Sequence, residues 1–345
     1  MNVAAYQPLV LVSTEKLSRP DWLAYRRQGL GGSDAAAVLG ISPFRTARDL
    51  YYDKLGIVTA DDQENWVALE MGTLLEPLVA RIFAKKTGLN IYQRKCMFQH
   101  PHHPWMLADL DFLTELPDGR TAILEIKTTN YNARDKWWYG STEIVPAYYE
   151  AQGRHYMAVM NLDRVYYCCL YGNNEDEVII RHIDRDMDYE SELISVEEDF
   201  WNSHVLAKLP PPYRETGGLI MESLRRTLGP LDTDAPPIAF SKTQSARVAH
   251  FLELQKEKAL KDANVKAISA EMERLKALIV ADMGTSCTAV TEDGYTVTWK
   301  SSQKPTVSKT MLERLREVHP DIYAEYVTTS ESRRFKIKEP KPDAA

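Results

Sequence analysis

The sequence predicts a protein of the α/β (α+β) class that ends in a helical and small β extension. Three observations lead to this prediction. Short helix and strand patterns are mixed over residues 15–208, proline and glycine gather over 209–238, and a long helical pattern follows. The 345 residues suffice for two domains. We expect a main domain at 1–208, a Pro/Gly-rich linker or arm at 209–238 and an extension at 239–345.

Three helices of the main domain have recognisable ends. The segment Ser33–Leu39 opens on a serine that can cap a helix. The segment Met71–Lys86 carries an apolar stripe and stops before Gly88, with Pro77 either kinking the helix or sitting in its first turn. A third helix is expected over Pro146–Met160, because proline is favoured at helix starts.

The extension shows a different pattern. Apolar residues repeat at spacings of four, three and four, which predicts a helical stripe that packs on another helix. This stripe consists of Ile268, Met272, Leu275 and Ile279. A hairpin with its turn at Asp293-Gly294, a short helix over 308–318 and a basic final strand over 333–338 are expected next.

Composition limits the class of protein. Apolar runs are too short for a membrane span, and the N-terminal residues do not resemble a signal peptide, so we expect a cytoplasmic protein. The four cysteines have no CxxC spacing, which disfavours a zinc site or a disulfide framework. The formal net charge of −7 weighs against a nucleic-acid partner, although an acidic surface can coexist with a basic channel.

The segment 106–128 carries the chemistry. Two alternating runs flank Pro117-Asp118-Gly119, a turn signature that predicts a β-hairpin. Folding the chain about Asp118 places Asp111 opposite Glu125 and Asp109 opposite Lys127, with each pair of Cβ atoms about 5 Å apart. A slip of one residue would change this pairing.

Two opposed carboxylates repel each other unless a cation lies between them. Oxygen ligands with open positions suit Mg²⁺, and an ammonium group beside them can stabilise charge on a phosphate. Asp111, Glu125 and Lys127 would supply these groups for metal-assisted hydrolysis. A solvated strand face with cross-strand ion pairs is the alternative, and geometry alone does not decide between the two.

Four ordered blocks resemble the YqaJ/lambda-exonuclease (phage-type alkaline exonuclease) family of PD-(D/E)XK nucleases, over roughly residues 20–205. The blocks are Trp22–Gly40 with Arg26-Arg27-Gln28-Gly29-Leu30-Gly31-Gly32-Ser33-Asp34, Met71-Gly72-Thr73-Leu74-Leu75-Glu76-Pro77, Asp111 with Glu125-Ile126-Lys127, and Tyr148-Tyr149-Glu150-Ala151-Gln152. Leu110 stands where the family usually has proline. The resemblance implies a restriction-endonuclease-like core, in which helices flank a mixed central sheet.

The resemblance also implies roles for individual residues. Asp111 and Glu125, with the main-chain carbonyl of Ile126, would bind Mg²⁺ (or Mn²⁺ in its place), and Glu76 would help hold a second ion. Lys127 would be the catalytic lysine, and Gln152 would contact the active site. The resemblance gives Asp109 no role, and we interpret it as a partner of Lys127.

A terminal 5′-phosphate would be bound by Arg26 and Ser33, with Arg27 as the alternative arginine. The residues themselves support this hypothesis. Gly31 and Gly32 allow close backbone approach, the helix that Ser33 opens presents free N–H groups, and an arginine offers a planar fork for phosphate.

By resemblance, the chain would be a 5′→3′ exonuclease that degrades one strand of linear double-stranded DNA from its end. It would form a homotrimeric ring around DNA and act beside a single-strand annealing protein in phage or mobile-element recombination. Two alternatives remain open: a restriction-like endonuclease with the same metal core, and a non-catalytic DNA-binding protein of recombination.

Overall fold

The computed structural model describes residues 6–57, 66–228, 237, 239–283, 286–290, 296–299 and 307–327. The chain separates into two compact units, Met1–Ala235 and Pro236–Ala345, and each is described by itself. Among the described residues, we find no helix with the length and apolarity needed to cross a membrane.

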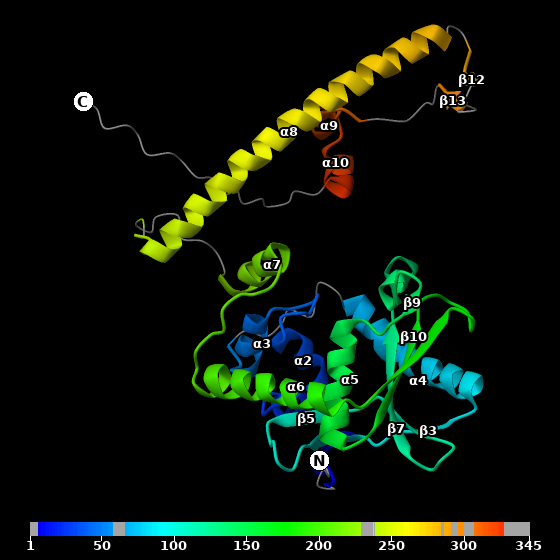
Figure 1. The fold of residues 1–345 in the computed structure, drawn as a ribbon, viewed down its shortest axis with the longest axis vertical. Coiled ribbons are helices and arrows are strands. Elements are labelled where there is room, and N and C mark those ends of the chain that lie inside the picture. Colours follow the sequence, from blue (N-terminus) through cyan, green and yellow to red (C-terminus); the bar gives the residue numbers. More distant parts are fainter. Residues whose placement is uncertain are drawn as a thin grey trace. The chain divides into compact units, whose positions relative to one another are not determined.

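The first unit mixes helices and strands throughout its length (Figure 1). In chain order, its elements are β1 (Leu9–Ser13), α1 (Arg19–Arg26), β2 (Leu30–Gly31), α2 (Gly32–Val38), α3 (Ala47–Lys54), α4 (Trp66–Thr87), β3 (Asn90–Tyr92), β4 (Cys96–Gln99), β5 (Met106–Asp109), β6 (Phe112–Glu115), β7 (Thr121–Thr128), the 3₁₀-helix η1 (Tyr131–Trp137), β8 (Trp138–Tyr139), β9 (Thr142–Glu143), α5 (Ala147–Met160), β10 (Arg164–Leu170), β11 (Val178–Asp184), α6 (Met187–Asp199), the π-helix η2 (Phe200–Leu206) and α7 (Gly217–Leu228).

The principal sheet has five strands in the order β11-β10-β7-β6-β3. Strands β10 and β7 run parallel, and the other neighbours run antiparallel. A second sheet, in the order β1-β4-β5-β2, is also mixed, because β2 runs parallel to β5. The predicted α/β class with a mixed sheet flanked by helices is confirmed.

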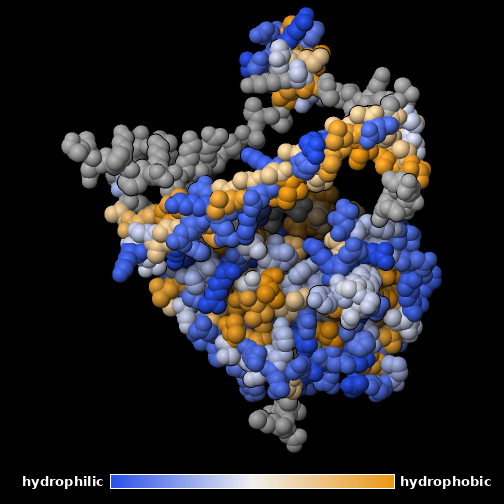
Figure 2. All heavy atoms as spheres, turned by 45° about the horizontal axis from the view of Figure 1, so that its top comes forward, coloured by the Kyte–Doolittle hydropathy of each residue, from blue (hydrophilic) through white to orange (hydrophobic). Residues whose placement is uncertain are grey.

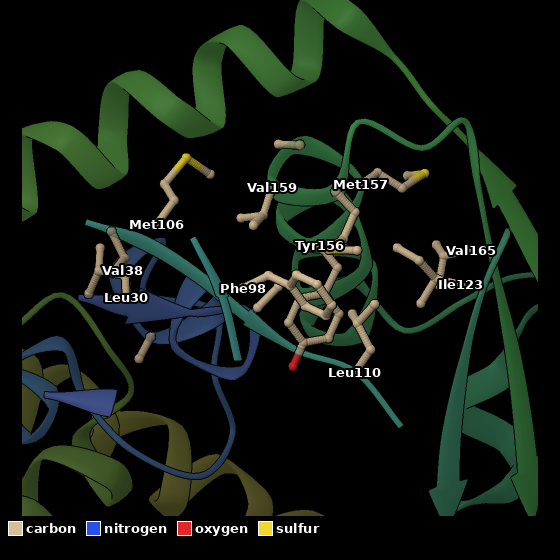
Figure 3. Packing of buried hydrophobic residues seen from close by; sticks show 14 of the residues in the cluster. Leu30, Val38, Phe98, Met106, Leu110, Ile123, Tyr156, Met157, Val159 and Val165 are labelled. Carbon is tan, nitrogen blue, oxygen red and sulfur yellow. The ribbon is translucent and has the colours of Figure 1, made fainter. Parts of the chain in front are cut away.

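Alternation along β7 divides the core into two layers. Ile123 belongs to the apolar cluster formed with helix α5, whereas Leu124 and Ile126 pack with residues of α4 such as Phe83. Figure 3 shows α5 residues, including Met157, among apolar side chains of the surrounding strands. Side chains on the α5 face of β7 therefore point towards α5, and this face also carries Glu125 and Lys127.

The register of the β6–β7 hairpin is the one that the sequence predicts. Phe112 pairs with Leu124, and Glu115 pairs with Thr121, so opposed residue numbers sum to 236. Gly119 adopts a φ of +82° in the connecting turn, a conformation that glycine reaches without steric cost. The chemistry-bearing residues at the open end of this hairpin are thereby fixed in place.

One predicted pairing in this segment is wrong. Asp109 does not lie opposite Lys127, because it belongs to β5 of the second sheet. The hairpin strand β6 begins only after Leu110-Asp111. Asp109 pairs in register with Met97 of β4, and its carboxylate accepts a hydrogen bond from Trp22 Nε1 at 2.6 Å. The interpretation of Asp109 as the partner of Lys127 is therefore corrected.

The helices differ from the prediction in length and in one location. Those expected over 33–39 and 146–160 appear as α2 and α5, but α4 begins at Trp66, so Pro77 lies well inside it. In place of the irregular linker or arm expected over 209–238, helix α7 forms within the first unit. The helix can form because the prolines of this segment lie outside residues 217–228. Its Ser223 is buried and donates a hydrogen bond to Asp49.

In the second unit, the long helix α8 (Lys242–Met283) precedes the strands β12 (Thr288–Val290) and β13 (Thr296–Thr298) and the helices α9 (Lys309–Val318) and α10 (Pro320–Tyr326). The antiparallel pairing of β12 with β13 and the capping of α9 by Ser308 confirm the expected hairpin and short helix. The turn at Asp293-Gly294 and the basic strand over 333–338 lie outside the described residues.

Candidate active site

Most of the predicted site residues of the first unit converge on one cavity of about 600 Å³, but Ile126 and Arg27 do not line it. The residues that line it and bear on its chemistry are Trp22, Arg26, Gly31, Ser33, Glu76, Arg94, Lys95, Asp109, Asp111, Glu125, Lys127, Gln152 and Tyr156. They come from both sheets and from helices α1, α2, α4 and α5. Four of the side chains carry a fixed positive charge, so an acidic protein presents a locally mixed, partly basic cavity.

Asp111 and Glu125 form the acidic centre of this cavity. The Oδ2 atom of Asp111 accepts a hydrogen bond of 2.8 Å from the main-chain N–H of Ile126, which fixes this carboxylate at the end of the hairpin. Burial, together with the charge of Glu125, raises the pKa of Asp111 to about 7. Burial also raises the pKa of Glu125. The two carboxylates are therefore held close together at an energetic cost.

Lys127 and Gln152 hold one oxygen of Glu125. The Nζ atom of Lys127 donates to Glu125 Oε1 at 2.6 Å, and Gln152 Nε2 donates to the same oxygen. Burial acts to lower the pKa of Lys127, but Glu125 and Asp111 outweigh it and hold this pKa above its ordinary value. The Lys127 ammonium, which also lies 4.9 Å from the ring centroid of Tyr149, thus remains charged.

The other oxygen of Glu125 indicates which kind of ligand this centre suits. Oε2 is buried and has no hydrogen-bond partner within the described part of the chain. A buried carboxylate oxygen without a partner is costly, and a cation would satisfy it. Two carboxylates suit a hard divalent ion such as Mg²⁺. The described residues contain no group of three or more His, Cys, Asp or Glu side chains arranged to hold a metal.

Glu76 approaches the same cavity from helix α4. Burial, followed by the charges of Asp111 and Asp109, raises the pKa of Glu76 to about 7. Three carboxylates therefore repel one another electrostatically across this space. A cation bound among them would relieve the repulsion, so the electrostatics fit the predicted metal centre.

Arg26 and Ser33 lie together at a second part of the cavity. Arg26 Nη2 donates to Ser33 Oγ at 2.8 Å, and its Cζ atom lies 4.9 Å from the centroid of the Trp22 ring. The ring and the hydroxyl orient the guanidinium beside the start of α2. Gly32 is required there, because a Cβ atom would lie 2.5 Å from the ring of Tyr156.

Asp34 is the buried anion that holds this cationic region together. Its side chain is fully buried and forms ion pairs with Arg26 (3.2 Å), Lys54 (2.7 Å) and Arg45. Burial alone would raise the pKa of Asp34, but the three cations hold it far below its ordinary range. At Lys54 burial dominates and lowers the pKa to about 8.

The structure separates the two candidate arginines. Arg26 lines the cavity, whereas Arg27 does not and instead lies 3.5 Å from Asp53. Sequence reasoning gave no role to Trp22 or Tyr156. Trp22 connects Arg26 with Asp109, and Tyr156 lies 3.4 Å from Gln152 Nε2, contacts that no local pattern reveals.

One curated protein and two solved structures are among the proteins similar to this chain. Protein YqaJ of Bacillus subtilis (strain 168), which carries no assigned function in its name, is 28% identical over 96% of this chain and 97% of its own. The alkaline exonuclease LHK-Exo of Laribacter hongkongensis is 19% identical, covering 55% of this chain and 94% of its own at a TM-score of 0.43. A phage-related exonuclease of Haemophilus somnus 129PT is 12% identical, covering 52% of this chain and 96% of its own at a TM-score of 0.37.

The family comparison is the most specific of these findings. Residues 21–163 match the YqaJ-like viral recombinase domain. This match includes the cavity-lining residues from Trp22 to Tyr156. The resemblance that the four sequence blocks carry is thereby confirmed over the part of the chain that this domain matches.

Proposed function

We propose that this protein is a Mg²⁺-dependent 5′→3′ exonuclease, which degrades one strand of linear double-stranded DNA from its end and leaves 3′ single-stranded overhangs for strand annealing. The observation that carries the proposal concerns Oε2 of Glu125, which is buried and has no hydrogen-bond partner among the described residues. Asp111 and Lys127 line the same cavity. The names of the similar exonucleases and the recombinase domain favour the same substrate class.

Asp111, Glu125 and the carbonyl of Ile126 would hold one Mg²⁺, and Glu76 would help hold a second; Mn²⁺ would fit the same oxygen ligands. When bound, the metal supplies Lewis acidity and lowers the pKa of a coordinated water. Lys127 places a fixed positive charge where negative charge develops on the phosphate. Its short hydrogen bond to Glu125 orients both side chains.

Gln152 holds Glu125 Oε1, which would leave Oε2 available to a cation. Arg26 and Ser33 would bind the terminal 5′-phosphate through a planar guanidinium and a hydroxyl group. Both groups line the same cavity as Asp111, so end recognition and hydrolysis would take place in one cavity. Arg27, paired with Asp53, is not required for this contact.

The proposed setting is cytoplasmic DNA recombination, in which the overhangs pass to a single-strand annealing protein. A homotrimeric ring would allow an acidic protein to hold DNA, since only the bore of the ring has to be basic. The proposed domain organisation keeps the nuclease within residues 1–208 and the extension at 239–345, and helix α7 lies in the segment between them.

The test is digestion of linear duplex DNA carrying either a 5′-phosphate or a 5′-hydroxyl, with Mg²⁺ and with a chelator. We expect rapid loss of the 5′-phosphorylated strand, slower attack on the 5′-hydroxyl end, and no reaction with chelator. Lys127→Ala should abolish hydrolysis, whereas Lys85→Ala, at an exposed ion pair with Glu175, should not.

Closed circular DNA separates the alternatives. Efficient cutting of the circle would replace the proposal by a restriction-like endonuclease. DNA binding without hydrolysis under every condition would replace it by a non-catalytic recombination protein. Equal rates on both 5′ ends would contradict the role of Arg26 and Ser33.

A further inference from the structure

Helix α8 carries an apolar seam with the period of a coiled coil. Val265, Ile268, Met272, Leu275 and Ile279 follow one another at spacings of three, four, three and four. This spacing averages 3.5 residues, the repeat that keeps one face of a helix against a partner helix. In heptad notation, residues 265, 272 and 279 take position a, and residues 268 and 275 take position d.

The seam is uncovered within the described residues of its own unit. The side chains at the five seam positions are between 45% and 65% exposed, and no residue of α8 is buried. Figure 2 shows hydrophobic residues at the surface of this helix amid hydrophilic ones. The helix has 42 residues and is therefore about 63 Å long. A helix gains most of its stability from packing of its apolar face, so this seam requires a partner.

Charges beside the seam identify the partner and its direction. Glu271 takes position g and Lys276 takes position e of the following heptad. In a parallel pair of identical helices, g of one copy meets the following e of the other, so Glu271 meets Lys276. In an antiparallel pair g meets g and e meets e, so Glu271 and Lys276 would not face each other. The other flanking positions beside the seam, Asn264, Ser269 and Leu278, are uncharged.

The same register explains where the seam begins. Lys258 and Lys261 occupy the preceding a and d positions, and both are turned to ion pairs along the helix, with Asp262 and Glu257. Charged groups at core positions oppose helix pairing, so the apolar contact begins at Val265. Near the other end of the seam, Lys276 at position e contacts Trp299, and its Nζ atom lies 5.7 Å from the centroid of the Trp299 ring.

We propose that residues 265–279 of α8 form a parallel, in-register coiled coil with the same segment of a second copy of this chain. This proposal is independent of the nuclease proposal, because it uses residues of the second unit alone. It assigns the C-terminal extension to self-association, whatever contacts the first units make with each other.

Cysteine cross-linking tests the proposal on the full chain. In a Cys287→Ser background, which removes the exposed thiol of the second unit, Ile268→Cys places a thiol at position d. Mild oxidation should join two chains covalently, because d side chains of parallel, in-register helices face each other. Ala270→Cys, at position f on the opposite side of α8, is the matched control and should cross-link several-fold less.

Packing of the seam against the chain's own first unit, or antiparallel pairing, would leave Ile268→Cys no more cross-linked than Ala270→Cys. Either result would overturn the proposal. The readout does not depend on total oligomeric mass, so association of the first units cannot imitate it.

A charge exchange tests the direction independently. Glu271→Lys should reduce cross-linking at residue 268, because two lysines then meet across the pair. Adding Lys276→Glu should restore it, since the attractive pairs return with their signs exchanged. In an antiparallel pair the second change would restore nothing, so failure of the restoration contradicts the parallel arrangement.

Discussion

Replacing Asp34 by asparagine should destabilise the first unit by about 3–5 kcal/mol, the usual cost of removing one partner from a buried ion pair. Asp34 is fully buried, and the side chain of Lys54 is 1% exposed at a distance of 2.7 Å. The substitution keeps the size of the side chain and removes its charge. Lys54, Arg45 and Arg26 would then repel one another without a compensating anion.

Urea unfolding followed by tryptophan fluorescence measures this effect, because six of the seven tryptophans lie in the first unit. Asp118→Asn is the matched control: it breaks an ion pair with Arg120 in which both side chains are more than half exposed. We expect the control to unfold at the wild-type urea concentration. Indistinguishable midpoints for Asp34→Asn and Asp118→Asn would refute the assignment of Asp34 as a buried anchor.

Two further predictions concern helix α5. Burial acts to lower the pKa of His155, but Glu197 at 2.9 Å raises it overall. The ion pair of protonated His155 with Glu197 therefore stabilises the fold fully below about pH 6.5, and this stabilisation is lost as pH rises through the folded-state pKa. The difference in unfolding free energy between wild type and His155→Gln should accordingly narrow at alkaline pH, and a difference that widens would contradict this. Gly153→Ala should lower the unfolding free energy by about 1–3 kcal/mol and reduce the proposed nuclease activity, because its Cβ would lie 1.9 Å from the hydroxyl of Tyr167. Gly217→Ala, which meets nothing within 4 Å, should melt like wild type, and equal melting of both variants would argue against tight packing at α5.

Local sequence predicted the hairpin well because its register depends on neighbouring residues. The turn at Pro117-Asp118-Gly119 and the alternation of β6 and β7 suffice to place Asp111 near Glu125. The same alternation continues through Asp109, yet the chain changes sheet there. A local pattern carries no information on which sheet a strand joins, and this explains the error at Asp109.

The remaining parts of the site depend on distant residues. Asp34 belongs to a block that the sequence singles out, but its three cations come from α1, the segment before α3, and α3 itself. The contact between Trp22 and Asp109 spans 87 residues. Helix α7 was missed because proline and glycine dominate the composition around it, whereas residues 217–228 themselves contain no proline.

Isothermal titration of Mg²⁺ into the protein tests the central claim most directly, with Asp111→Asn, Glu125→Gln and the surface control Asp118→Asn. If the unpartnered oxygen of Glu125 and the carboxylate of Asp111 share a cation, wild type and Asp118→Asn will bind Mg²⁺, and the two cavity variants will lose this binding while remaining folded. Binding of equal strength in Asp111→Asn and in wild type would contradict the account.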